Sequence, residues 1–95
     1  MSKKNVKYIV VCCVDREIYK LNGGKVFNTP TEASEAMLID FKNDLENNSC
    51  EPNNTDLIKI NNFDYEGDEY GISQTSAWLN GENGNYDWSV IEIYI

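Results

Sequence analysis

The fold is decided by the most apolar stretch of the chain, Lys7-Tyr8-Ile9-Val10-Val11-Cys12-Cys13-Val14. It is far shorter than the roughly 20 apolar residues that cross a bilayer. Its length and its β-branched residues predict a buried strand instead. Because alternate side chains of a strand point to opposite faces, both faces of this strand are apolar. We therefore expect a central strand whose second face is covered by a long loop, a second copy of the chain or a partner.

The composition is that of one folded domain, residues 1–95. With 41% hydrophobic residues the chain is too apolar to be disordered, despite a formal charge of -8. The three cysteines are Cys12, Cys13 and Cys50, an odd number without CxxC spacing. Reduced thiols and a cytoplasmic location fit this pattern, and no apolar segment for export follows the first residues.

The chain contains no histidine. This excludes Ser-His and Cys-His catalysis and histidine-containing zinc sites. Cys50 is followed by Glu51 and lacks the neighbouring cations that lower a thiol pKa, so it is not expected to be a nucleophile. We expect a protein that is not an enzyme and that holds no cofactor and no metal.

The charge is unevenly distributed. Residues 1–25 carry a balance of +4, whereas residues 26–95 carry -12. A negative surface repels nucleic acid and accelerates association with a basic protein surface, so a basic protein partner is expected and direct nucleic-acid binding is not. Membrane association is not expected either. The alternative is that the acidic surface serves only solubility.

The N-terminal quarter predicts a hairpin and a further short strand. Asp15-Arg16 suits a two-residue turn, and residues 17–21 alternate as the second strand. A tight turn at Asn22-Gly23-Gly24 then leads to a short strand at residues 25–27.

The start of a helix is marked by Thr29-Pro30-Thr31-Glu32, in which Thr29 can cap, proline suits the first position and Glu32 completes a capping box. The helix is expected at about residues 30–47. Its apolar stripe comprises Ala33, Met37, Phe41 and Leu45, widened by Ala36 and Leu38, and its solvent face comprises Glu35, Lys42, Asp44 and Glu46.

The C-terminal half predicts further strands. Residues 57–63, 72–79 and 86–95 show strand patterns, separated by an acidic turn at 64–71 and a Gly/Asn loop at 80–85. The expected fold is therefore α+β: a mainly antiparallel sheet of four to six strands in the order β-β-(β)-α-β-β-β, with one amphipathic helix packed on one face.

The acidic turn is the first place to look for a metal. Asp64, Glu66 and Asp68 have the spacing of a calcium loop, but Glu69 and Thr75 stand where that loop needs glycine and glutamate. An EF-hand is excluded. A weaker cation site, a solvated turn and a patch that meets a basic partner are the alternatives.

The aromatic residues of the acidic half lie among carboxylates, which is the wrong charge for nucleic acid and is typical of a protein interface. The candidate partner-binding residues are Asp64, Tyr65, Glu66, Asp68, Glu69, Tyr70, Glu82, Tyr86, Asp87 and Trp88. The alternative is that Trp78 and Trp88 form a cross-strand pair that caps the core.

In size, charge and lack of catalytic residues, the chain resembles the small acidic inhibitors encoded by phages and mobile elements, including nucleic-acid mimics and anti-CRISPR proteins. The resemblance implies a non-enzymatic protein that docks on a basic nucleic-acid-binding or nuclease protein and blocks it. The alternatives are a homodimeric structural or interaction module without inhibitory role and a toxin-immunity protein.

Overall fold

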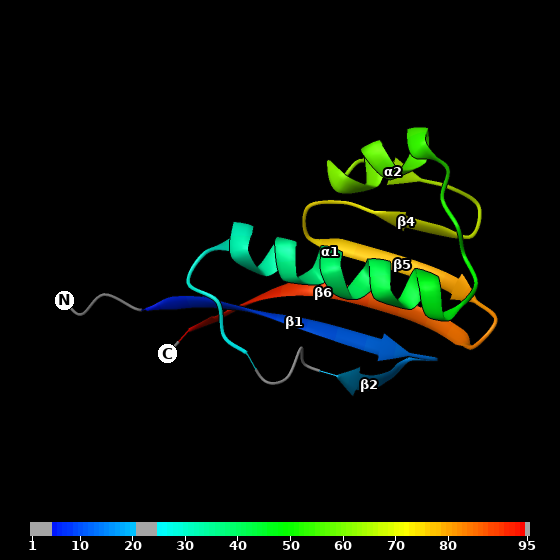
Figure 1. Cartoon of the computed structure of the whole chain (residues 1–95). Coiled ribbons are helices and arrows are strands. Elements are labelled where there is room, and N and C mark those ends of the chain that lie inside the picture. Colours follow the sequence, from blue (N-terminus) through cyan, green and yellow to red (C-terminus); the bar gives the residue numbers. More distant parts are fainter. Residues whose placement is uncertain (1–4, 21–24, 95) are drawn as a thin grey trace.

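A computed structural model describes residues 5–20 and 25–94, apart from the side chains of residues 18–20 (Figure 1). The elements follow the order β1 (Val6–Val14), β2 (Glu17–Lys20), α1 (Pro30–Asn47), α2 (Asn54–Asn61), β3 (Tyr65–Glu66), β4 (Tyr70–Ile72), β5 (Ser76–Gly81) and β6 (Gly84–Tyr94). The expected α+β class, with one main helix packed on an antiparallel sheet, is confirmed. No helix among the described residues is long and apolar enough to cross a membrane.

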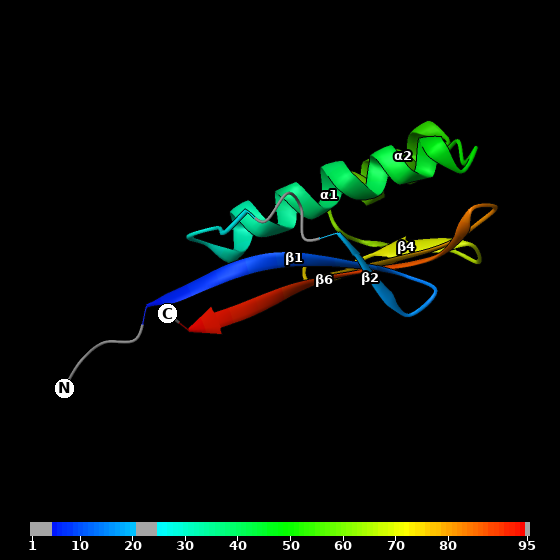
Figure 2. The same cartoon turned by 90° about the horizontal axis from the view of Figure 1, so that it is seen from below.

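The strands form one six-stranded antiparallel sheet in the order β2-β1-β6-β5-β4-β3. β1 lies inside the sheet, as expected, and pairs with β6 from Val6 opposite Tyr94 to Val14 opposite Tyr86. The two helices connect β2 at one edge with β3 at the other, and both lie on the same side of the sheet (Figure 2).

The hairpin between β1 and β2 is confirmed. Asp15 and Arg16 have φ angles of 52° and 73°, and two positive φ angles in a two-residue loop match the right-handed twist of the flanking strands. The strand expected at residues 25–27 is reduced to one bridge, in which Phe27 pairs with Tyr8. Leu21 and the turn expected at residues 22–24 lie outside the described residues.

Helix α1 begins and ends as predicted. The Thr29 hydroxyl accepts a hydrogen bond from the Glu32 backbone N–H at 3.1 Å, and Pro30 occupies the first turn. The four central residues of the predicted stripe are at most 2% exposed and pack on the sheet. Asp44 was expected to face water, but it is only 5% exposed because its side chain points towards β1, close to Cys12.

The prediction of a strand at residues 57–63 is wrong, because residues 57–61 belong to helix α2. The Asn53 side chain caps the helix by accepting a hydrogen bond from the Asp56 backbone N–H at 2.8 Å. Ile58 and Ile60 would share one face of a strand, but in the helix Ile58 is 64% exposed and Ile60 is fully buried. In the sequence, Ile58 and Ile60 are compatible with a strand and with a helix, and the capping residue Asn53 is the local signal that favours the helix.

The acidic segment 64–71 is not only a turn. It contains β3 and the start of β4, which pair as Tyr65 opposite Ile72 and Glu66 opposite Gly71. The expected C-terminal hairpin is present, but β5 begins only at Ser76 and β6 already at Gly84, so the loop is shorter than predicted. Ile95 lies outside the described residues.

The core lies between the sheet and the helices. Its buried residues are Val10, Cys12, Ala33, Met37, Phe41, Leu45, Ile60, Ile72, Ala77, Leu79, Tyr86 and Trp88. The aromatic rings meet in this layer, with Phe41 and Trp88 edge to face at 5.4 Å between ring centroids. No described segment covers the other face of the sheet (Figure 2).

Candidate functional site

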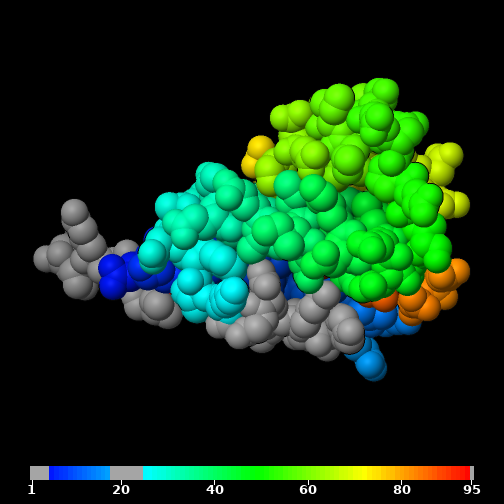
Figure 3. Space-filling model, viewed as in Figure 1, coloured from blue at the N-terminus to red at the C-terminus, as the bar shows by residue number. Residues whose placement is uncertain are grey.

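Three connections of the fold meet at one end of the sheet (Figure 3, right-hand end) and line an open hollow of about 580 Å³, here called the acidic hollow. They are the loop that follows α1, the turn between β3 and β4 and the turn between β5 and β6. Each connection contributes one exposed carboxylate: Glu51, Glu69 and Glu82 respectively. The lining residues are Asn48, Ser49, Cys50, Glu51, Glu69, Tyr70, Asn80, Gly81 and Glu82.

Asn48, the residue after the last turn of α1, fixes the geometry of this end. Its side chain is 4% exposed and donates to the Asp44 carbonyl oxygen at 2.8 Å, while its Oδ1 atom accepts from the Asn83 backbone N–H at 2.8 Å. The helix end and the β5–β6 turn are thereby held together. Only glycine fits at position 81 in this arrangement, because a Cβ atom there would overlap the Asn48 side-chain amide.

Hydrogen bonds also hold two of the segments that carry the carboxylates. The Asn80 backbone N–H donates to the Glu69 carbonyl oxygen at 2.7 Å, which ties the β3–β4 turn to β5. The Ser49 hydroxyl donates to Glu82 Oε1 at 3.0 Å. Glu82 is therefore oriented towards the loop that carries Glu51, and the site is partly ordered before anything binds.

Electrostatics at the hollow favour cations. Burial, followed by the charges of Glu69 and Glu82, raises the pKa of the Cys50 thiol. Burial, followed by the neighbouring Tyr65, Cys50, Asp56 and Glu69, raises the pKa of the Tyr70 hydroxyl. Both groups therefore stay neutral at physiological pH, in agreement with the expectation that Cys50 is not activated.

Among the described residues, the lining of the hollow contains no lysine and no arginine. A carboxylate set without a cation of its own, next to the half-buried ring of Tyr70, suits the guanidinium or ammonium group of another molecule. The raised pKa of the Cys50 thiol argues against an activated nucleophile, and the carboxylates suit the binding of a cationic group.

The structure brings only some of the predicted site residues together. Glu69, Tyr70 and Glu82 line the acidic hollow. Asp64, Tyr65 and Glu66 line a separate hollow of about 380 Å³ beside Trp78. Asp68 is exposed in the turn between β3 and β4, and Asp87 is exposed on β6 beside Asp15 and Arg16.

Two of the predicted anchors are wrong, because Tyr86 and Trp88 lie in the core. They are 9% and 1% exposed, and their rings stack at 5.7 Å between centroids beneath α1. Trp78 does not pair with Trp88 either, since Trp78 stands opposite Asp87 and Trp88 opposite Ala77. The two indoles therefore lie on opposite faces of the sheet.

Sequence reasoning missed the contribution of the loop after α1. The sequence here predicts only the end of a helix followed by an extended loop, and nothing in the order of Asn48, Ser49, Cys50 and Glu51 indicates a contact with residues 80–83. Only the packing of α1 along β5 and β6 brings them there.

A second cluster of chemically useful side chains lies between β1 and α1. One ligand atom from each of Cys12, Asp40 and Asp44 lies within 4.8 Å of the others, a donor set that a metal ion could use. Trp88 donates to Asp40, and all three side chains have further interactions within the protein. The cluster is therefore interpreted as part of the core.

Comparison with protein-family models, with curated proteins and with solved structures finds no match to this chain. The function is therefore argued from the site.

Proposed function

We propose that this chain is a small, non-enzymatic binding protein that docks on a basic site of another protein through the acidic hollow and blocks that site. The observation that carries the proposal is the meeting of Glu51, Glu69 and Glu82, from three separate connections, around Tyr70. The three carboxylates come from distant parts of the chain, yet they line one hollow together with Tyr70.

The contact proposed is an arginine or lysine of the partner inserted among these carboxylates. A guanidinium group can take two parallel hydrogen bonds from one carboxylate and stack on an aromatic ring at the same time, which favours arginine. The charge of the exposed turn residue Asp68 adds to the field that attracts such a partner.

The partner class follows from the charge. Proteins that carry basic clefts are mostly those that bind nucleic acid, so a nucleic-acid-binding or nuclease protein is the partner proposed. A chain with a formal net charge of -8 would compete with nucleic acid for such a cleft. A toxin-immunity protein would use the same contact and would differ only in the identity of its partner.

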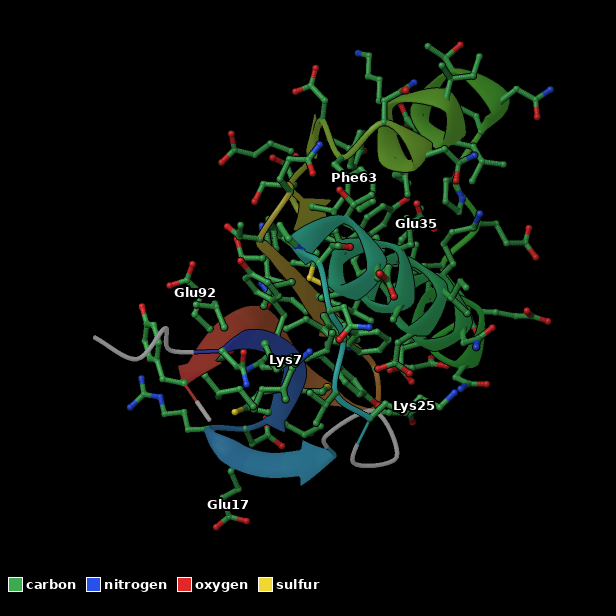
Figure 4. The ribbon with its side chains drawn as sticks, turned by 90° about the vertical axis from the view of Figure 1, so that its left-hand side faces the viewer. Lys7, Glu17, Lys25, Glu35, Phe63 and Glu92 are labelled. Atoms are coloured by element: carbon green, nitrogen blue, oxygen red, sulfur yellow. The ribbon has the colours of Figure 1, made fainter. Side chains whose placement is uncertain are left out.

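The test is affinity capture from a lysate of the source organism, washed at low and at high salt. Glu51→Lys/Glu69→Lys is the test variant, and Glu17→Lys/Glu35→Lys is the matched control with the same change in net charge at two exposed positions (Figure 4). The proposal expects a basic protein that is retained by the wild type and the control at low salt, and lost by the test variant. Equal loss in both variants would mean that the overall charge, and not the hollow, does the binding.

A further inference from the structure

The face of the sheet turned away from the helices carries an apolar strip, here called the open strip. Its members are Ile9, Val11 and Cys13 on β1, Ile91 and Ile93 on β6, and Trp78 on β5. Figure 2 and Figure 4, the latter seen from the end of the sheet that carries Lys7, show both helices on the opposite side. Among the described residues nothing packs over this strip, and Ile91 is 41% exposed.

The open strip runs along β1, where Ile9, Val11 and Cys13 follow one another on one face. Ile9 stands opposite Ile91 of β6, whereas Val11 and Cys13 stand opposite Ser89 and Asp87. A strand with one face towards water normally alternates with polar residues, whereas both faces of β1 are apolar from Tyr8 to Val14. A partly exposed apolar strip that no described segment covers is typical of a contact surface.

On the described part of the face of β1 and β6 that carries the open strip there is one positive and one negative side chain, and they lie at opposite ends of the strip. Lys7 lies at the rung of Ile93, and Asp87 lies at the rung of Cys13. Six residues separate the two rungs, about 20 Å along the strands. The Lys7 ammonium group donates to the neutral Asn28 side chain, and Asp87 is exposed.

We propose that a second copy of the chain covers the open strip, with a two-fold axis running across the strands at the level of Val10. This axis reverses the strand direction of the second copy, so that β1 lies over β1. Ile9 then faces Val11 of the second copy, and Lys7 lies within reach of Asp87 of the second copy, twice by symmetry. Two sheets packed face to face in this way adopt a common arrangement of sheet proteins.

A second copy fits better than another occupant. The strip offers a balanced charge, one lysine against one aspartate, so two copies can meet there despite their formal charge of -8 each. The acidic side chains of α1 lie on the other side of the sheet, and the acidic hollow at its end stays free. A strongly basic partner would find fewer carboxylates on this face than at the hollow, and an acidic partner would meet one cation, Lys7, among the described residues of β1 and β6 on this face.

The test is sedimentation velocity over a range of concentrations for the full chain, for Lys7→Asp, for Asp87→Lys and for an equimolar mixture of the two variants. The wild type should form a dimer. Each variant alone places two like-charge pairs in the interface and should weaken self-association about tenfold or more. In the mixture both pairs are again of opposite charge, so the dimer should return as a heterodimer.

Restoration in the mixture is diagnostic because residues 7 and 87 of one chain are too far apart to pair with each other. Ile91→Lys should also abolish the dimer, whereas Ile39→Lys, the same change at a position on α1 that is 64% exposed, should not. Circular dichroism of each variant verifies the fold. A wild type that stays monomeric at several hundred micromolar would leave the open strip to a different partner and overturn the proposal, and a dimer that the mixture fails to restore would overturn the proposed orientation.

Discussion

The indole N–H of Trp88 donates a hydrogen bond to the Asp40 carboxylate across 2.9 Å, which joins β6 to α1. The same indole packs against Phe41 and Tyr86. A residue whose position in an acidic, aromatic segment suggests a surface anchor is therefore one of the main links between the helix and the sheet.

Replacing Trp88 with phenylalanine should destabilise the fold. The change removes the hydrogen bond to a carboxylate and leaves unfilled volume beside Phe41, so we expect the free energy of unfolding to fall by about 2 to 4 kcal/mol. Urea denaturation followed by circular dichroism measures it. The control is Tyr94→Phe, which removes an exposed hydrogen bond to Glu92 and should leave the stability almost unchanged. Equal effects of the two changes would show that the Trp88 contact is not a structural link.

Because residues 54–61 form a helix, substitution of Ile60 and of Ile58 by alanine should lower the free energy of unfolding by very different amounts. Ile60→Ala should cost about 2 to 5 kcal/mol because the side chain is fully buried, and Ile58→Ala should cost less than about 0.5 kcal/mol because it is 64% exposed. Urea denaturation of both variants gives the comparison. Similar losses at the two positions would favour a strand, in which both side chains share one face.

Gly81→Ala should disrupt the acidic hollow. The new methyl group would collide with the Asn48 side chain, whose amide joins the helix end to the β5–β6 turn, and we expect a loss of about 1 to 3 kcal/mol. Gly67→Ala is the control, because there the methyl group meets the end of the Tyr65 ring, which can move. Thermal unfolding of the two variants tests the difference, and a larger loss for Gly67→Ala would contradict the role given to Asn48.

The raised pKa of Cys50 predicts slow reaction with thiol reagents near neutral pH. Because a thiolate is the reactive form, the rate in a Cys13→Ser background should keep rising with pH beyond the range of an ordinary thiol. Removing a neighbouring negative charge with Glu69→Gln should lower that pKa and increase the rate at pH 8, whereas Glu35→Gln should not. Stopped-flow measurements with a chromogenic disulfide give both rates, and identical pH profiles would place Glu69 away from the thiol.

The sequence alone predicts the elements whose signals are local. Thr29 and Pro30 mark the start of α1, and the apolar run from Tyr8 to Val14 marks the inner strand. It does not predict α2, because Ile58 and Ile60 fit a strand until the cap at Asn53 is recognised. Nor can alternation tell which face of β6 the helix covers, so the position of Trp88 among carboxylates suggests a surface anchor although the residue lies in the core.

The candidate site was predictable only in part, for a similar physical reason. The charge of the C-terminal half identifies Glu69 and Glu82 as candidates. The third carboxylate, Glu51, reaches the hollow because α1 ends where β5 turns into β6, a contact that depends on the whole fold.

The most direct measurement is a titration of ¹⁵N-labelled protein with a hexa-arginine peptide, followed by NMR chemical shifts. If the acidic hollow is the receptor for a basic group, the amides of Glu51, Glu69, Tyr70 and Glu82 should shift first and most. These shifts should disappear in Glu51→Lys/Glu69→Lys and persist in Glu17→Lys/Glu35→Lys. Shifts of equal size spread over the acidic residues of α1 and the C-terminal strands would contradict a specific site and would leave the acidic surface with a role in solubility alone.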